Sequence, residues 1–207
     1  MDIYTINAKD LVINEYEALR YLGYVRSSIT DEDIEIVKAA IEEVRVLAAP
    51  KACFERYPVT ISEDFDITMP YGIIHSKDLA TNLNGCSEIY IFAATIGPRF
   101  DMALTRQRQI SIAKAAVYQS VGAATVEALC DTLNEDLRRK VLEEGGALHP
   151  RFSPGFGDMS LDNQKGIFSV LRPEKSIGLT LKDNLIMAPE KSVTAIIGIE
   201  NNIYDRR

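Results

Sequence analysis

Histidine and cysteine, the side chains that most often hold metal ions, are scarce in this sequence. The chain has only two histidines, His75 and His149, and three widely spaced cysteines, Cys53, Cys86 and Cys130. No C-x-x-C motif is present, which argues against a zinc ribbon or a cysteine-ligated iron–sulfur cluster. We therefore expect no metal site, and we interpret the three cysteines as reduced thiols of a cytoplasmic protein.

Clusters of basic residues and long apolar runs are also missing. The formal net charge is −7, and no nucleic-acid partner is expected because phosphate contacts need clustered lysine and arginine. We interpret the short basic groups as solvated faces or a chain end: 106–108, 138–140 and Arg206–Arg207. No apolar run approaches the ~20 residues that cross a bilayer. The N-terminus lacks the apolar region of a signal peptide, so no membrane association is expected.

Sequence motifs of self-contained catalytic sites are absent as well. The chain has no G-x-G-x-x-G, no P-loop sequence, no G-x-S-x-G and no H-E-x-x-H. These motifs carry dinucleotide binding, phosphate binding, nucleophilic hydrolysis and zinc-dependent hydrolysis. Their absence favours a protein that binds a small molecule or a partner, and we assign no catalytic residue.

The composition that remains is typical of a folded protein, with 46% hydrophobic and 26% charged residues over 207 positions. No internal repeat or low-complexity linker divides the chain, so we expect a single domain over 1–207. Its expected parts are an N-terminal helical segment, a sheet with a long helix, and a motif loop with a C-terminal hairpin, at about 8–50, 51–146 and 147–207. We predict an α+β fold in which helices flank a central, largely antiparallel sheet.

Apolar periodicity, together with capping and stop residues, predicts the individual elements. The predicted strands are ACFERYPVTI, the segment around ITMPYGII, residues 88–94, SIGLTL and SVTAIIGI, the last two joined by KDNLIMAPE. Six helices are predicted. The first ends at Gly23, the second runs from a Thr30 cap to Pro50, and the third follows a Ser76 cap to Gly85. The fourth begins at Pro98, the fifth spans 111–144, and the sixth follows a Ser160 cap over 161–171.

The stretch RFSPGFGD, residues 151–158, reads as an irregular loop. Pro154-Gly155 predicts a turn, and a second glycine frees the backbone again within three residues. The loop holds the Arg151 guanidinium close to the rings of Phe152 and Phe156. It is either a ligand pocket or a corner between two elements.

Two further features leave alternatives open. Glu127 lies among the small residues of the predicted helix 111–144, and it is either a surface charge or a ligand contact in a narrow groove. Those small residues let another backbone approach closely, at a cost in helix propensity near Gly122. The helix that opens at Pro98 is either an anion site or an ordinary strand-to-helix connection.

Beyond these local patterns, several stretches resemble a known family. RFSPGFGD resembles the arginine-x-x-proline-glycine-aromatic motif of the activation domain of vitamin B12-dependent methionine synthase. GLTLKDNLIMAPEKSVTAIIG is similar to a later motif of that domain, in which an L-T strand leads to Met, Pro and a Ser-Val strand. Three earlier stretches fit compact, stand-alone members of the family and follow in order along the chain: LRYLGY at 19–24, FAATIG at 92–97 and GAATVEALCD at 122–131.

The resemblance implies a ligand and a set of residues that bind it. In the family, the activation domain binds S-adenosylmethionine, which supplies the methyl group when cob(II)alamin is reduced by flavodoxin and remethylated. Arg151 would pair with the methionine carboxylate, Glu127 would pair with the ammonium, and Phe156 would cover the adenine or the sulfonium. Backbone groups of three more residues would hydrogen-bond the ligand, which completes the implied cofactor-binding set: Arg151, Phe152, Ser153, Gly155, Phe156 and Glu127.

The chain departs from the family pattern in ways that shape its expected role. It lacks the corrinoid, folate and homocysteine modules, and Phe156 stands where the motif has tyrosine. It also lacks D-x-H-x-x-G, by which many corrinoid domains offer histidine to cobalt, so cobalamin would be held only by a partner. We therefore expect an accessory component that reactivates a separately encoded methionine synthase lacking its own activation domain, with flavodoxin or another reductant as electron donor.

Two other hypotheses stay open at this point. The chain is alternatively a corrinoid-protein adaptor of the same fold, which does not bind S-adenosylmethionine and serves another methyltransferase system. A purely structural or oligomerisation module is the third reading. The two C-terminal motifs argue against it, because a bare scaffold has no need of an arginine fixed in a turn with two glycines.

Overall fold

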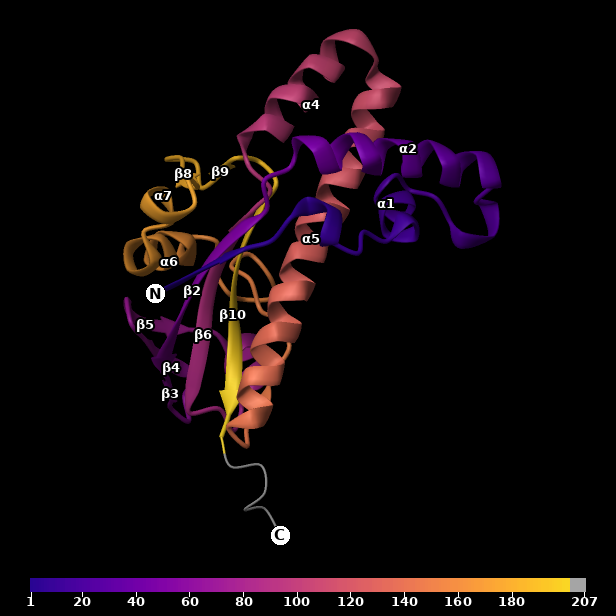
Figure 1. The fold of residues 1–207 in the computed structure, drawn as a ribbon. Coiled ribbons are helices and arrows are strands. Elements are labelled where there is room, and N and C mark those ends of the chain that lie inside the picture. Colours follow the sequence, from indigo (N-terminus) through magenta and orange to yellow (C-terminus); the bar gives the residue numbers. More distant parts are fainter. Residues whose placement is uncertain (202–207) are drawn as a thin grey trace.

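A five-stranded antiparallel sheet forms the centre of the protein (Figure 1). The computed structural model describes residues 1–201, so the Arg206–Arg207 pair lies outside the described residues. The strand order is β1 (Asp2–Thr5), β2 (Lys51–Pro58), β6 (Glu88–Thr95), β10 (Ser192–Glu200) and β7 (Ala147–Leu148). The three long strands β2, β6 and β10 thus lie next to one another in the middle, and the two edge strands are short.

Strand β6 is buried on both faces. Tyr90 and Phe92 join the core on one side of the sheet, whereas Ile89 and Ile91 join the core on the other side. Successive strand residues point to opposite faces, so a strand covered on both sides reads as a continuous apolar run. This explains why EIYIFAAT gives so clear a signal and confirms the strand predicted at 88–94.

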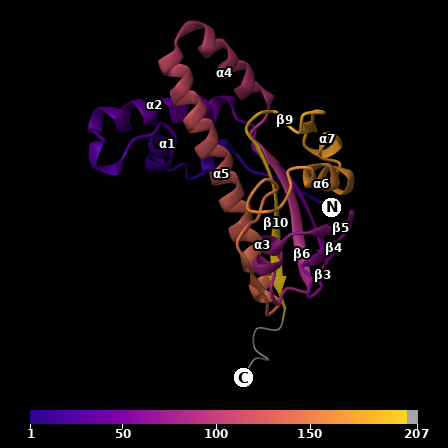
Figure 2. The same ribbon diagram turned by 180° about the vertical axis from the view of Figure 1, so that it is seen from behind.

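A layer of helices lies on one side of the sheet (Figures 1 and 2). They are α1 (Glu15–Tyr21), α2 (Asp31–Leu47), α4 (Pro98–Ile110) and α5 (Ile112–Glu143). The 32-residue α5 runs alongside the sheet, while its N-terminal part and α4 project beyond the sheet. Short 3-10 turns at Ala8–Asp10 and Arg26–Ser28 connect this layer.

Smaller elements cover the other face. Figure 2 shows α3 and α6 on this side, together with the small sheet of β3, β4 and β5. The bounds are β3 (Thr60–Ile61), β4 (Asp66–Met69), β5 (Gly72–His75), α3 (Lys77–Asn82), α6 (Asn163–Leu171), α7 (Pro173–Ser176), β8 (Thr180–Leu181) and β9 (Met187–Ala188). The predicted α+β class, with helices flanking an antiparallel sheet, is confirmed.

Several helix ends lie where the sequence placed them. Thr30 forms a capping box with Asp33 at the start of α2, and the Ser76 hydroxyl accepts a hydrogen bond from the Leu79 amide at the start of α3. Pro98 occupies the first turn of α4, directly after Gly97 with a φ of 88°. These signals are local, because a cap or a fixed φ acts within one turn of its own residue.

Other predictions were wrong in detail. Ser160 does not cap α6: its hydroxyl accepts from the Asp162 amide in a turn, and the helix begins at Asn163. SIGLTL does not pair with SVTAIIGI, because β8 pairs with β9 from the connecting segment, and β10 lies in the central sheet. The small residues of α5 do lie against other helices, and the ring of Phe100 from α4 packs against Gly122.

Candidate functional site

The motif loop begins as an extension of the central sheet. After β7, the His149 amide donates to the Gly198 carbonyl at 2.9 Å. Phe152 then exchanges two backbone hydrogen bonds with Ile196 of β10, at 2.9 and 2.8 Å. Residues 147–152 therefore follow the edge of the sheet, and Arg151 is held by ordered backbone on both sides.

A tight turn follows at once. The Gly155 amide donates to the Met159 carbonyl at 2.9 Å, and the Phe156 amide donates to the Ser153 carbonyl at 3.1 Å. Gly155 has a φ of 91° and Gly157 a φ of 52°, values that L side chains rarely adopt. The predicted turn at Pro154-Gly155 is confirmed.

The far end of the loop docks on the N-terminus of α3. The Asp158 carboxylate accepts from the Ser76 hydroxyl and from the Lys77 amide at 2.8 Å. In return, the Asp158 amide donates to the Asp78 carboxylate at 3.2 Å. A Cβ on Gly157 would overlap Asp78, so only glycine permits this approach. These contacts satisfy helix N-terminal donors from a distant part of the chain.

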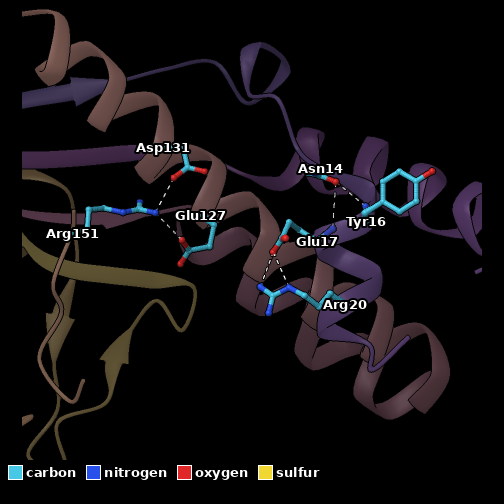
Figure 3. A network of polar contacts seen from close by, with 7 residues as sticks. All are labelled: Asn14, Tyr16, Glu17, Arg20, Glu127, Asp131 and Arg151. Carbon is cyan, nitrogen blue, oxygen red and sulfur yellow. Dashed lines mark hydrogen bonds and ion pairs between the residues drawn. The ribbon is translucent and has the colours of Figure 1, made fainter. Parts of the chain in front are cut away.

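Arg151 projects from the loop towards α5, where two carboxylates meet it (Figure 3). Its Nη2 donates to Asp131 at 2.8 Å and to Glu127 at 3.2 Å. The Arg151 side chain is 24% exposed. Its Nη1 is buried and has no hydrogen-bond partner among the described residues. A guanidinium with one unused buried donor is able to take a further acceptor.

The thiol of Cys130 lies beneath this arginine. Burial raises the pKa of Cys130 to about 12, although the Arg151 guanidinium acts in the opposite direction. A thiol with so high a pKa stays protonated at neutral pH and is a poor nucleophile. Cys130 is therefore a free, buried thiol in the core beneath the arginine.

A cavity of about 250 Å³ lies beside Arg151. Its lining residues are Glu127, Arg151, Phe152, Ser153, Phe156 and Val193. Phe156 is 68% exposed, which is unusual for a large aromatic side chain in a folded protein. Its ring lies at the mouth of the cavity and is not part of the core.

The structure thus brings together five of the six residues predicted to bind a cofactor. Gly155 does not line the cavity and serves the turn. The amides of Phe152 and Gly155 donate to the carbonyls of Ile196 and Met159, and the backbone contacts of these two residues with a ligand stay a prediction. The Ser153 hydroxyl makes no hydrogen bond within residues 1–201.

Sequence reasoning missed one member of the site, Asp131. Residues four apart lie on the same face of a helix, so Glu127 and Asp131 are neighbours on α5, and both contact Arg151. The alternative anion site at the start of α4 finds no support. The first turn of that helix holds Asp101, whose carboxylate accepts from the Glu190 amide at 2.6 Å.

Comparisons with known proteins rest on the fold. No protein-family model and no curated protein sequence matches the chain. The structure aligns with "Crystal Structure of the MetH Reactivation Domain bound to AdoHcy" with a TM-score of 0.73 and 15% sequence identity, over 95% of this chain and 77% of that one. The chain has the fold of the MetH reactivation domain. The resemblance noted for the two C-terminal motifs is confirmed at the level of fold.

Residues 1–201 show neither a membrane-spanning helix nor a metal site. No helix in this part of the chain has both the length and the apolar character that a bilayer crossing requires. In the same range, no group of three or more histidine, cysteine, aspartate or glutamate side chains is arranged to hold a metal ion. The cavity beside Arg151 is the candidate site that the motif loop lines.

Proposed function

We propose that the chain binds S-adenosylmethionine in the cavity beside Arg151. The observation that carries the proposal is that the loop residues and Glu127, which come from separate parts of the sequence, line one cavity. The buried and unpartnered Nη1 of Arg151 is an atom that a ligand carboxylate would satisfy. A protein of the same fold has been crystallised with AdoHcy.

Charge complementarity supports this ligand. Arg151 brings one positive charge and Glu127 and Asp131 bring two negative charges, a formal net charge of about −1 for the three. S-adenosylmethionine carries a carboxylate, an ammonium and a sulfonium, and thus a net charge of about +1. Arg151 would hold the carboxylate, Glu127 would hold the ammonium, and the ring of Phe156 would cover the adenine or the sulfonium.

The size of the cavity sets how the ligand is held. Pockets that enclose a drug-sized ligand measure roughly 300–1,000 Å³, and this cavity measures about 250 Å³. It therefore accommodates the amino-acid end of the ligand, while the adenosine extends over the exposed ring of Phe156 at the mouth.

We further propose that the chain supports reductive remethylation of cob(II)alamin in a separately encoded cobalamin-dependent methionine synthase, in the cytoplasm. When bound, S-adenosylmethionine supplies an activated methyl group to a corrinoid that has taken up one electron, and leaves as S-adenosylhomocysteine. The residues of this chain bind and orient the methyl donor, and no general acid or base is required of them. The partner holds the cobalamin, and flavodoxin or another reductant supplies the electron.

A second candidate is a corrinoid-protein adaptor of the same fold that does not bind S-adenosylmethionine. One observation favours it: the guanidinium of Arg151 already donates to two carboxylates of α5. In this reading the arginine fixes the loop to the helix, and the exposed ring of Phe156 meets a partner protein.

Calorimetric titration of the purified chain with S-adenosylmethionine, and in parallel with S-adenosylhomocysteine, tests the first proposal. We expect saturable binding at micromolar concentration. Arg151→Ala should weaken it by about 2–3 kcal/mol, or roughly 30- to 150-fold, because a charged hydrogen-bonded partner is lost. Arg138→Ala, which removes an exposed arginine elsewhere on α5, is the matched control and should leave affinity unchanged.

The two candidates give different outcomes. No heat and no thermal shift at millimolar ligand would rule out the ligand and favour the adaptor, which predicts stable capture of a corrinoid protein. Saturable binding leads to the second assay, methylation of cob(II)alamin in a methionine synthase that lacks its activation domain. If ligand binds and no remethylation follows, the role in reactivation is wrong although the site is right.

A further inference from the structure

A second groove lies on the helical layer, away from the motif loop. It has a volume of about 640 Å³ and shares no residue with the cavity beside Arg151. Helices α2, α4 and α5 form it where α4 projects beyond the sheet (Figure 1). Its principal lining residues are Val46, Leu47, Arg99, Met102, Arg106 and Tyr118.

The floor of this groove has an apolar part. Val46 on α2 is 67% exposed, and Met102 on α4 is 72% exposed. On α4, the positions of Arg99, Met102 and Arg106 follow a spacing of three and then four residues. That spacing places them in one stripe on one side of the helix. An apolar centre is thus flanked by two arginines.

These two arginines are unpaired. Among the described residues, neither Arg99 nor Arg106 takes part in an ion pair or in a side-chain hydrogen bond, and both are exposed. The carboxylate that lines the groove is Glu43, which accepts from Lys114 at 3.0 Å and from the Tyr118 hydroxyl. Those two donors lower the pKa of Glu43, with the tyrosine as the larger cause.

The groove is therefore locally positive in a chain whose net charge is −7. The ion pair with Lys114 neutralises Glu43, so nothing in the groove offsets the charges of Arg99 and Arg106. Unpaired charge of one sign beside exposed apolar side chains is typical of an interaction surface for a partner of opposite charge.

We infer that this groove docks an acidic, amphipathic helical segment of a partner protein. Seven residues of α-helix rise about 10 Å, so Arg99 and Arg106 match two carboxylates about 10 Å apart on such a segment. An apolar side chain between those carboxylates packs against Met102 and Val46. The inference does not rest on the proposed function, because the groove and the cavity beside Arg151 have no residue in common.

A synthetic peptide provides the test. It is an acetylated, fluorescently labelled helical peptide with two glutamates seven residues apart and leucines between them, titrated with the full chain by fluorescence anisotropy. We expect saturable binding that weakens with salt, as electrostatic association does. Replacing both glutamates with glutamine should weaken binding at least tenfold.

Charge reversal locates the site. The double variant Arg99→Glu with Arg106→Glu should weaken peptide binding at least tenfold. Both positions are exposed, so we expect the variant to keep the fold, and thermal unfolding checks that it does. The matched control, Arg138→Glu with Lys140→Glu, changes the net charge equally at exposed positions of α5 and should alter binding less than twofold.

Four outcomes would overturn the inference. They are no saturable binding of the peptide, an equal loss in the control variant, self-association by light scattering that the Arg99/Arg106 reversal abolishes, and binding to phosphatidylserine vesicles that the same reversal abolishes. The third outcome assigns the groove to a second copy of the chain, and the fourth assigns it to a lipid surface.

Discussion

Arg151 and Asp131 form an ion pair of 2.8 Å between the motif loop and α5, twenty residues apart in the sequence. The Asp131 side chain is 72% exposed, whereas that of Arg151 is 24% exposed. An exposed carboxylate thus occupies a donor of a largely buried guanidinium. A ligand carboxylate that pairs with both Nη1 and Nη2 of Arg151 has to compete with Asp131 for Nη2.

Removing this competitor gives the first prediction. Asp131→Asn should tighten S-adenosylhomocysteine binding by up to about fivefold, because an exposed ion pair contributes about 0.2–1 kcal/mol. S-adenosylmethionine should gain less, since the lost carboxylate also attracts the sulfonium. Calorimetry with both ligands measures the two changes. Weaker binding of both would mean that Asp131 contacts the ligand and does not compete with it.

The exposed ring of Phe156 gives a prediction that separates binding from stability. Phe156→Ala should leave the melting temperature unchanged, because the side chain is 68% exposed, and should reduce affinity for S-adenosylmethionine. Phe156→Tyr keeps the ring and should bind as well as the wild type. A drop in melting temperature with intact affinity would show that the ring packs in the core.

The cap that Asp158 places on α3 gives a pH dependence. Hydrogen bonds from Ser76 and the amides of Lys77 and Asp78 lower the pKa of Asp158. Its ionised form therefore stabilises the fold above the unfolded-state pKa of about 3.9, and this contribution is lost as the pH falls below that value. Asp158→Asn should lower the urea midpoint at neutral pH.

Repeating the urea titration at about pH 3 completes this test, since the carboxylate is then largely protonated in the unfolded chain and increasingly so in the folded one. The difference between Asp158→Asn and the wild type should shrink there. A difference of the same size at both pH values would show that the charge of Asp158 does not contribute.

Replacing Gly122 with alanine should destabilise the protein, which is opposite to the usual effect of this substitution in a helix. Glycine to alanine within a helix normally stabilises by about 1 kcal/mol. Here a Cβ would overlap the ring of Phe100, so Gly122→Ala should destabilise the protein by about 1–3 kcal/mol. Adding Phe100→Leu should recover part of that loss, because the two sites are in contact. A stabilising Gly122→Ala would contradict the close packing of α4 on α5.

Local signals in the sequence predicted much of the fold. Thr30 and Ser76 cap helices with their own neighbours, and Pro98 sets its own φ, so no distant contact is needed to predict them. Edge strands such as β7 depend on pairing with β10 and leave no pattern of their own in two residues. The helix cap predicted at Ser160 was wrong because a serine hydroxyl accepts a backbone hydrogen bond equally well in a turn.

The candidate site was predicted from a different kind of information. Residue patterns alone left Glu127 undecided between surface and ligand, and only the family resemblance placed it with Arg151. The structure brings the two within 3.2 Å. No sequence pattern shows that β10 and Met159 accept hydrogen bonds from the amides of Phe152 and Gly155, so which backbone groups stay open to a ligand could not be predicted.

The anchoring of the motif loop has a thermodynamic consequence. The bridge between Phe152 and Ile196 holds one end, and the cap that Asp158 forms on α3 holds the other. Fixing the backbone of one residue costs about 1–2 kcal/mol of conformational entropy, and five residues lie between these anchors. That entropy is lost when the chain folds, so a ligand that enters the cavity meets a loop that is already ordered.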